Sequence, residues 1–85
     1  MRRVVTVVSK DGCHLCEALV EALTRLAPRY DIEVRVLDIA HDAGLHDRYW
    51  LTIPVVQVEG RDVFDARDIR PGVDYSSRLE ALLKP

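Results

Sequence analysis

The stretch Val4-Val5-Thr6-Val7-Val8-Ser9-Lys10-Asp11-Gly12-Cys13-His14-Leu15-Cys16 is the part of this 85-residue chain that decides the fold. Residues 4–8 are β-branched throughout, which predicts a strand that is buried on both faces near the centre of a sheet. A short polar turn ending in Gly12 follows, and two cysteines then stand three positions apart. The stretch therefore predicts a strand, a turn and a helix that begins at a CxxC pair.

The residues that follow predict a helix and a second strand. Apolar side chains recur after Gly12 at three- and four-residue spacing, which is typical of an amphipathic helix, and we expect this helix to end before Pro28. They are Leu15, Leu19, Ala22, Leu23 and Leu26. Apolar and charged residues alternate over 32–36, as in a strand. A strand, a helix and a second strand in this order predict a right-handed βαβ unit.

The second half of the chain adds a short helix, a hairpin and a last helix. Residues 40–49 carry a weak helical pattern, whereas 53–58 and 61–64 are short apolar runs separated by Glu59-Gly60, where the glycine supplies the positive φ of a tight turn. Residues 75–83 have helical spacing, with a start marked by Ser77 and Glu80 or by Asp74. The order βαβαββα predicts a single α/β domain over residues 1–85, with helices packed on one sheet.

Composition excludes several classes of protein. Hydrophobic residues make up 48% of the chain and charged residues 31%, with a net charge of −2, which is typical of a soluble folded domain. There is no basic stripe, so we expect no nucleic-acid partner. The apolar run 4–8 is too short for a signal peptide, and we expect a cytoplasmic protein without a membrane partner. Two closely spaced cysteines in such a protein indicate reactivity or metal binding rather than structural cross-linking.

The position of the cysteine pair favours redox chemistry. Unpaired backbone N–H groups and the positive end of a helix stabilise a thiolate, so we expect Cys13 to have a lowered pKa and to act as the nucleophile. Cys16, one turn further, is expected to be more buried and to resolve a mixed disulfide. A protonated His14 and the ammonium of Lys10 are candidates for lowering the Cys13 pKa further.

Two alternatives remain open at this point. One is a metal or iron–sulfur protein, in which the cysteines supply thiolates and His14, His41 or His46 offer imidazoles. The other is a redox-silent binding module. Both are weaker than the redox interpretation, because a complete tetrahedral metal site needs two more ligands and the flanking strand and helix suit a redox pair.

Together with Ile53-Pro54-Val55 and the hairpin, the cysteine stretch resembles the glutaredoxin-like family of the thioredoxin superfamily over nearly the whole chain. The resemblance implies a four-stranded mixed sheet with the first and third strands central and helices on both faces. It also implies a cis bond before Pro54, packed beside the CxxC, with the backbone of Ile53 aligning a bound peptide or glutathione. Trp50, an aromatic with a polar tip just before the proline, is expected to line the same groove.

The function implied by the resemblance is thiol–disulfide exchange by Cys13 and Cys16. The expected partners are proteins that bear disulfides, or glutathione, which is also a possible co-substrate. We expect a monomer with no bound cofactor and no metal.

The chain differs from typical dithiol glutaredoxins in two places. His14-Leu15 replaces Pro-Tyr between the cysteines, and Asp65-Ala66-Arg67-Asp68 follows the hairpin in place of a glycine pair that helps to bind glutathione. The buried acid that accepts a proton in thioredoxins has no clear counterpart either, and the first strand has only Thr6 as a polar side chain. The proton acceptor for Cys16 is therefore not predicted.

Overall fold

The computed structural model describes residues 2–84 and has a four-stranded sheet with helices on both faces. In chain order the elements are β1 (Arg3–Ser9), α1 (His14–Tyr30), β2 (Ile32–Asp38), the 3₁₀ turn η1 (Ile39–His41), α2 (Ala43–Tyr49), β3 (Val55–Val58), β4 (Arg61–Phe64), the 3₁₀ turn η2 (Ala66–Asp68) and α3 (Ser76–Leu83). The sheet order is β2-β1-β3-β4. The predicted order βαβαββα, with the first and third strands central, is confirmed.

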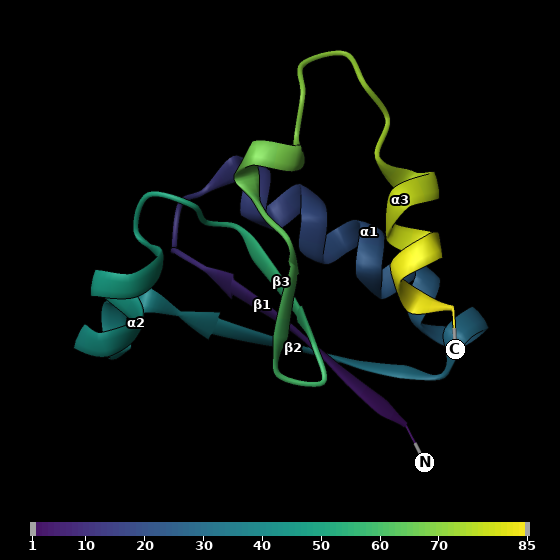
Figure 1. The fold of residues 1–85 in the computed structure, drawn as a ribbon, viewed down its shortest axis with the longest axis horizontal. Coiled ribbons are helices and arrows are strands. Elements are labelled where there is room, and N and C mark those ends of the chain that lie inside the picture. The colour runs from purple at the N-terminus through teal and green to yellow at the C-terminus, as the bar shows by residue number, and fades with distance from the viewer. Residues whose placement is uncertain (1, 85) are drawn as a thin grey trace.

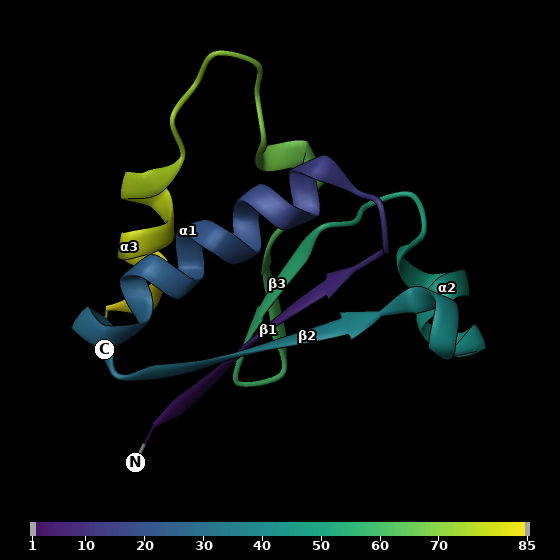
Figure 2. The same cartoon turned by 180° about the vertical axis from the view of Figure 1, so that it is seen from behind.

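Strand directions make the sheet mixed, as the resemblance implies. β1 runs parallel to β2, with Ser9 opposite Asp38, and antiparallel to β3, with Val8 opposite Val55. β3 and β4 form an antiparallel hairpin. Figure 1 and, from behind, Figure 2 show α1 and α3 side by side over one part of the sheet, with α2 at the opposite end, beyond β2. The connection from β1 through α1 to the parallel strand β2 is the predicted βαβ unit.

Each face of the sheet carries its own hydrophobic cluster, since successive residues of a strand point to opposite faces. Val5 and Val7 of β1 belong to the larger cluster with α1 and α3, whereas Val8 packs with the smaller one under α2. The larger cluster contains Val5, Val7, Leu19, Leu23, Ile32, Val56, Phe64, Leu79 and Leu83, and the smaller one Val8, Ile39, Tyr49 and Val55. Val4 and Thr6 are only half-buried, because α2 is short and covers one end of β1. The prediction that this strand is buried on both faces is therefore correct only for the end that α2 covers.

Helix α1 runs past Pro28, so the prediction that it ends before this proline is wrong. Its last residue is Tyr30, and Asp31 in the left-handed region (φ 52°) terminates it. Ala27 and Tyr30 both pack against the larger cluster, and this packing favours one more turn. Because Pro28 has no N–H, one hydrogen bond to the carbonyl of the exposed Thr24 is missing, and water can donate to this carbonyl instead.

Two turns also differ in detail from expectation. Glu59 (φ 53°) and Gly60 (φ 79°) both have positive φ, as a two-residue hairpin turn requires, although only the glycine was predicted to. At the start of α3, the Asp74 carboxylate accepts hydrogen bonds from the backbone N–H and hydroxyl of Ser76. Neither predicted cap stands at the N-cap itself, which is Tyr75 and makes no side-chain hydrogen bond; Asp74 lies one residue before it. Glu80 is occupied elsewhere, because it accepts a hydrogen bond from the Tyr30 hydroxyl at 2.8 Å.

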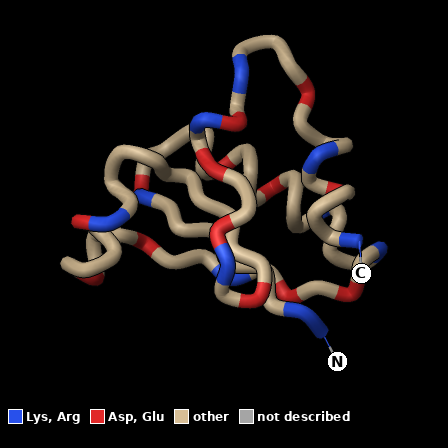
Figure 3. Tube along the Cα trace, in the orientation of Figure 1, with Lys and Arg blue, Asp and Glu red and all other residues tan. Residues whose placement is uncertain are grey.

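Charges of both signs are interspersed around the molecule (Figure 3). Several form ion pairs between neighbouring elements, including Arg78 with Asp68 at 3.1 Å and Arg29 with Glu80 at 3.3 Å. Exposed pairs of this kind contribute little to stability. Within residues 2–84, no helix is both long enough and apolar enough to cross a membrane.

Candidate active site

Cys13 lies at the N-terminal cap of α1. It has an extended backbone (φ −92°, ψ 107°), and its Sγ accepts a hydrogen bond from the backbone N–H of Cys16 at 3.2 Å. Gly12, with φ 76°, makes the turn before it, and the N–H of Cys13 donates to the carbonyl of Lys10 at 3.3 Å. A sulfur at this position faces the N–H groups that the first turn of a helix leaves unpaired, and these groups stabilise negative charge.

Cys13 and Cys16 form a disulfide, and the two sulfurs differ in exposure. The Cα atoms are 5.2 Å apart, a separation within the usual range for disulfides. Cys16 is 2% exposed, whereas Cys13 is partly exposed. Only the first sulfur is therefore open to a large partner, and the second is placed behind it.

The Ile53–Pro54 peptide bond is cis, as the resemblance implies, and it lies at the same end of the sheet as the cysteine loop. Val55, the next residue, pairs with Val8 at the end of β1 from which the cysteine loop departs. The loop before the proline is fixed by the Tyr49 carbonyl, which accepts hydrogen bonds from the N–H groups of Thr52 (2.9 Å) and Ile53 (3.1 Å). Pairing of β1 with β3 thus brings two distant motifs to one end of the sheet.

Tyr49 and Trp50 have different roles although they are adjacent. Tyr49 is buried in the smaller cluster, and its hydroxyl lies between Asp62 and Gln57. Trp50 is 55% exposed, and its ring stacks on His46 with centroids 6.4 Å apart. Trp50 lines a mainly apolar hollow of about 310 Å³ whose other lining residues are Lys10, Ile39, Ala40, His46 and Ile53. This hollow contains three residues predicted for the site: Lys10, Trp50 and Ile53.

His14 points into solvent. Its side chain is 97% exposed, and its Nδ1 lies 3.8 Å from a carboxylate oxygen of Glu17. Lys10 is exposed too, and it also lines a second hollow, which contains Asp11 and Gly12 of the cysteine loop. The influence of both side chains on Cys13 stays a prediction.

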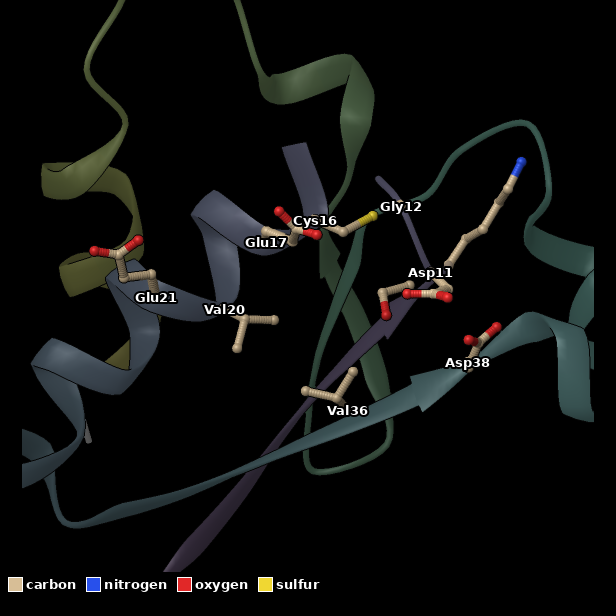
Figure 4. A pocket seen from close by; sticks show the side chains of 10 residues that line it. Asp11, Gly12, Cys16, Glu17, Val20, Glu21, Val36 and Asp38 are labelled. Atoms are coloured by element: carbon tan, nitrogen blue, oxygen red, sulfur yellow. The ribbon is translucent and has the colours of Figure 1, made fainter. Parts of the chain in front are cut away.

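The second hollow lies between the first turns of α1 and the C-terminal half of β2 (Figure 4). Its volume is about 430 Å³, with Cys16 in its wall and half-exposed Val36 on its floor. No local sequence pattern predicts this hollow. Asp38 belongs to it because it lies opposite Ser9 in the parallel pairing of β1 with β2, and this register cannot be read from local sequence.

In the segment after the hairpin, the polar groups form hydrogen bonds with one another. The Asp65 carboxylate accepts a hydrogen bond from the backbone N–H of Arg67 at 2.8 Å, and Asp68 accepts one from the N–H of Asp65 at 2.9 Å. These two bonds cap η2 at its start. Hydrogen bonds from the Arg67 side chain hold the pKa of Asp65 below its ordinary value.

The imidazoles do not gather at the cysteines. His41 lies in η1 and His46 in α2, both exposed. Among residues 2–84, no group of three or more His, Cys, Asp and Glu side chains is arranged to hold a metal ion.

Solved structures of other proteins, two of them thioredoxins, have the same fold. Protein Ne2328 from Nitrosomonas europaea superposes with a TM-score of 0.76 at 24% identity, covering 99% of this chain and 94% of the other. Thioredoxin 1 from Thermosipho africanus superposes at 0.60 with 16% identity, covering 93% and 89%. A mutant thioredoxin from Halobacterium salinarum superposes at 0.62 with 23% identity, covering 95% and 71%. These likenesses establish the thioredoxin fold.

The family assignment comes from the sequence. No curated protein matches the chain. The family model described as Glutaredoxin-like domain (DUF836), however, matches residues 4–84, from β1 to the end of α3. This span includes the CxxC pair and the cis proline, which together support a redox-type activity. The chain belongs to the glutaredoxin-like domain family.

Proposed function

We propose that the protein is a thiol–disulfide oxidoreductase that reduces or exchanges disulfides of other proteins, with Cys13 as the nucleophile and Cys16 as the resolving thiol. The observation that carries this proposal is the Cys13–Cys16 bond at the start of α1, with one sulfur accessible and the other 2% exposed. An accessible sulfur suits attack on a partner, and a buried neighbour suits its release.

The reaction has two steps that balance. The thiolate of Cys13 attacks one sulfur of a substrate disulfide, the substrate S–S bond breaks, and the other sulfur leaves as a thiolate and takes up a proton. Cys16 then loses its proton and attacks Sγ of Cys13, which closes the Cys13–Cys16 bond and releases the second substrate sulfur as a thiolate that takes up a proton. Two electrons pass from the protein to the substrate. This route needs no bound cofactor, because the electrons move only between sulfur atoms.

Exposed apolar side chains between the cysteines and just before the cis proline support a protein as the substrate. Leu15, Trp50 and Leu51 are 51%, 55% and 74% exposed, although large apolar side chains are usually buried. Leu15 lies between the cysteines, and the other two precede the cis proline. Exposed apolar groups beside a reactive centre suit contact with a protein surface better than contact with a small polar peptide.

The segment after the hairpin supports the same choice. In glutaredoxins that bind glutathione, this segment has a glycine pair, whereas here Asp65 and Asp68 cap η2 and bind Arg67. We infer that glutathione, if it serves, acts as a reductant of the Cys13–Cys16 bond rather than as the specific substrate. A monomer in the reducing cytoplasm is the setting in which such a pair would turn over.

A redox titration tests the proposed function. The protein is equilibrated in buffers of reduced and oxidised glutathione, free thiols are trapped by alkylation, and the trapped thiols are counted by mass spectrometry. We expect both thiols to disappear in one transition between about −200 and −300 mV. Cys16→Ser is the matched control and should instead carry glutathione on Cys13. If both thiols stay free in every oxidising buffer, the oxidoreductase proposal is wrong.

A comparison of substrates tests the choice of protein over glutathione. Reduction of insulin disulfides is measured beside reduction of the mixed disulfide of glutathione with a small thiol. Trp50→Ala should raise KM for insulin about tenfold, the equivalent of about 1.4 kcal/mol, and should leave turnover of the small disulfide unchanged. Equal losses with both substrates would show that Trp50 does not contact the protein substrate.

A further inference from the structure

The hollow beside Cys16 offers a route for the proton that this thiol must lose during resolution, a step that the cysteines alone cannot complete. Cys16 has to lose its proton to attack Cys13, yet its side chain is almost completely buried. The hollow of about 430 Å³ opens against it and has room for several water molecules. Figure 4 shows the sulfur of Cys16 directed toward Gly12 at one end of this hollow, with Asp38 across it on β2.

The charged side chains around this hollow differ in how firmly they are held. Glu17 and Glu21, on α1, are mostly exposed and face His14 (3.8 Å) and Arg25 (3.4 Å). Asp38 is half-buried at the end of β2. Its Oδ1 accepts a hydrogen bond from the backbone N–H of Ala40 at 2.8 Å, which caps η1 and occupies only one of its two oxygens. The full set of charged residues is Lys10, Asp11, Glu17, Glu21 and Asp38.

We propose that Asp38 accepts the proton of Cys16, through water in the hollow, as Cys16 attacks Cys13. This inference rests on the proposed function and identifies an acceptor for its second step. The S–H bond of Cys16 breaks and its proton passes through water to the Asp38 carboxylate. At the same time Sγ of Cys16 bonds to Sγ of Cys13, and the bond from Cys13 to the substrate sulfur breaks. That sulfur leaves with the electron pair and is protonated by solvent or by Asp38.

The direction in which the rate of resolution changes when Asp38 is removed distinguishes a proton acceptor from a purely electrostatic effect. A negative charge near a thiol disfavours the thiolate, so removing Asp38 would speed resolution if the carboxylate acted only through its charge. Removing a proton acceptor slows the step instead. Asp38→Asn distinguishes the two, because asparagine retains a side-chain oxygen that caps η1.

The experiment follows both steps with one aromatic disulfide, dithiobis(nitrobenzoate). Reduced protein is mixed with an equal amount of the reagent, and the absorbance of released thionitrobenzoate is recorded. The first release reports attack by Cys13, and the second, which does not depend on concentration, reports resolution by Cys16. In Asp38→Asn we expect an unchanged first release and a second release about a hundredfold slower near neutral pH.

The pH profile is the decisive measurement. With a carboxylate as acceptor, the second release should change little between about pH 6 and about pH 8. In Asp38→Asn it should rise about tenfold for each pH unit, because the rate then follows the thiolate fraction of Cys16. Glu21→Gln removes the same charge from the other side of the hollow and should behave as wild type. A second release in Asp38→Asn that equals or exceeds the wild-type rate overturns the proposal.

A second variant tests whether the slow second release in Asp38→Asn has a structural cause instead. Asp38→Ser also retains a capping oxygen and should show the same slow release, which added acetate should accelerate. Failure of acetate to accelerate it would count against Asp38 as the acceptor. The proposed function fails separately: if wild-type protein shows no rapid first release, then Cys13 is not an activated nucleophile, whatever the second release does.

Discussion

Removing the hydroxyl of Tyr49 is expected to destabilise the protein and to loosen the loop that carries the cis proline. This hydroxyl lies 3.2 and 3.1 Å from the two carboxylate oxygens of Asp62 and accepts a hydrogen bond from Gln57 Nε2 at 3.1 Å. The carbonyl of the same residue holds the N–H groups of Thr52 and Ile53. Tyr49 therefore connects α2, the hairpin and the proline loop.

The magnitude follows from what Tyr49→Phe removes. The ring remains, so no cavity forms, and the loss is the hydrogen bond to a carboxylate, which is worth about 1.5–3 kcal/mol. Asp62 is exposed and still accepts from Gln57 at 2.9 Å, so water and the amide compensate in part. We therefore expect the free energy of unfolding to fall by about 1–1.5 kcal/mol, near the lower limit.

Urea unfolding followed by circular dichroism measures this loss. The midpoint should decrease while the slope with denaturant stays constant, because the folded state keeps its compactness. A double-mutant cycle with Asp62→Asn should give a coupling of about 0.5–1 kcal/mol. A loss below about 0.3 kcal/mol in Tyr49→Phe, or additive effects in the cycle, would refute the reasoning.

Three other predictions concern the core, acid stability and the nucleophile. Leu19→Ala, at a fully buried position of the larger cluster, should lower the free energy of unfolding by about 2–5 kcal/mol in urea. The lowered pKa of Asp65 means that the folded protein binds fewer protons than the unfolded protein in acid. This contribution is complete above about pH 4 and is lost at lower pH, so Asp65→Asn should flatten the acid side of a plot of stability against pH. His14→Ala and Lys10→Ala should each raise the pKa of Cys13 measured in the reduced protein, because each removes a positive charge near the thiolate. If neither variant changes this pKa, neither side chain stabilises the thiolate.

Local patterns predicted most of the fold, and long-range contacts explain the errors. The β-branched run of β1 and the apolar spacing of α1 indicate that these side chains are buried, whichever elements of the fold cover them. The predicted end of α1 was wrong because Ala27 and Tyr30, on either side of Pro28, both pack on the core. Glu80 binds Tyr30, 50 positions away in sequence, and no local pattern at the start of α3 contains that information.

The candidate site divides in the same way. Whereas the cis bond before Pro54 was implied only by the family resemblance, Cys13 and Cys16 stand in a short motif, so their place at the start of α1 followed from the sequence. Asp38 did not, because its place beside the hollow depends on the register of β1 with β2. The exposure of Trp50 and the burial of Tyr49 depend on which side of α2 meets the sheet, since neighbouring residues on a helix point about 100° apart.

The cap that Cys13 provides to α1 links helix stability to the oxidation state of the dithiol. Folding and reduction form a thermodynamic cycle, so any difference in unfolding free energy between the reduced and oxidised forms shifts the reduction potential by an equal free energy. For a two-electron couple, about 1.4 kcal/mol corresponds to about 30 mV. The bridge closes a very short loop, with a sequence separation of 3, and constrains the unfolded chain only slightly. Interactions at the first turn of α1, including the hydrogen bond from the Cys16 N–H to the Cys13 sulfur, therefore act directly on how oxidising the protein is.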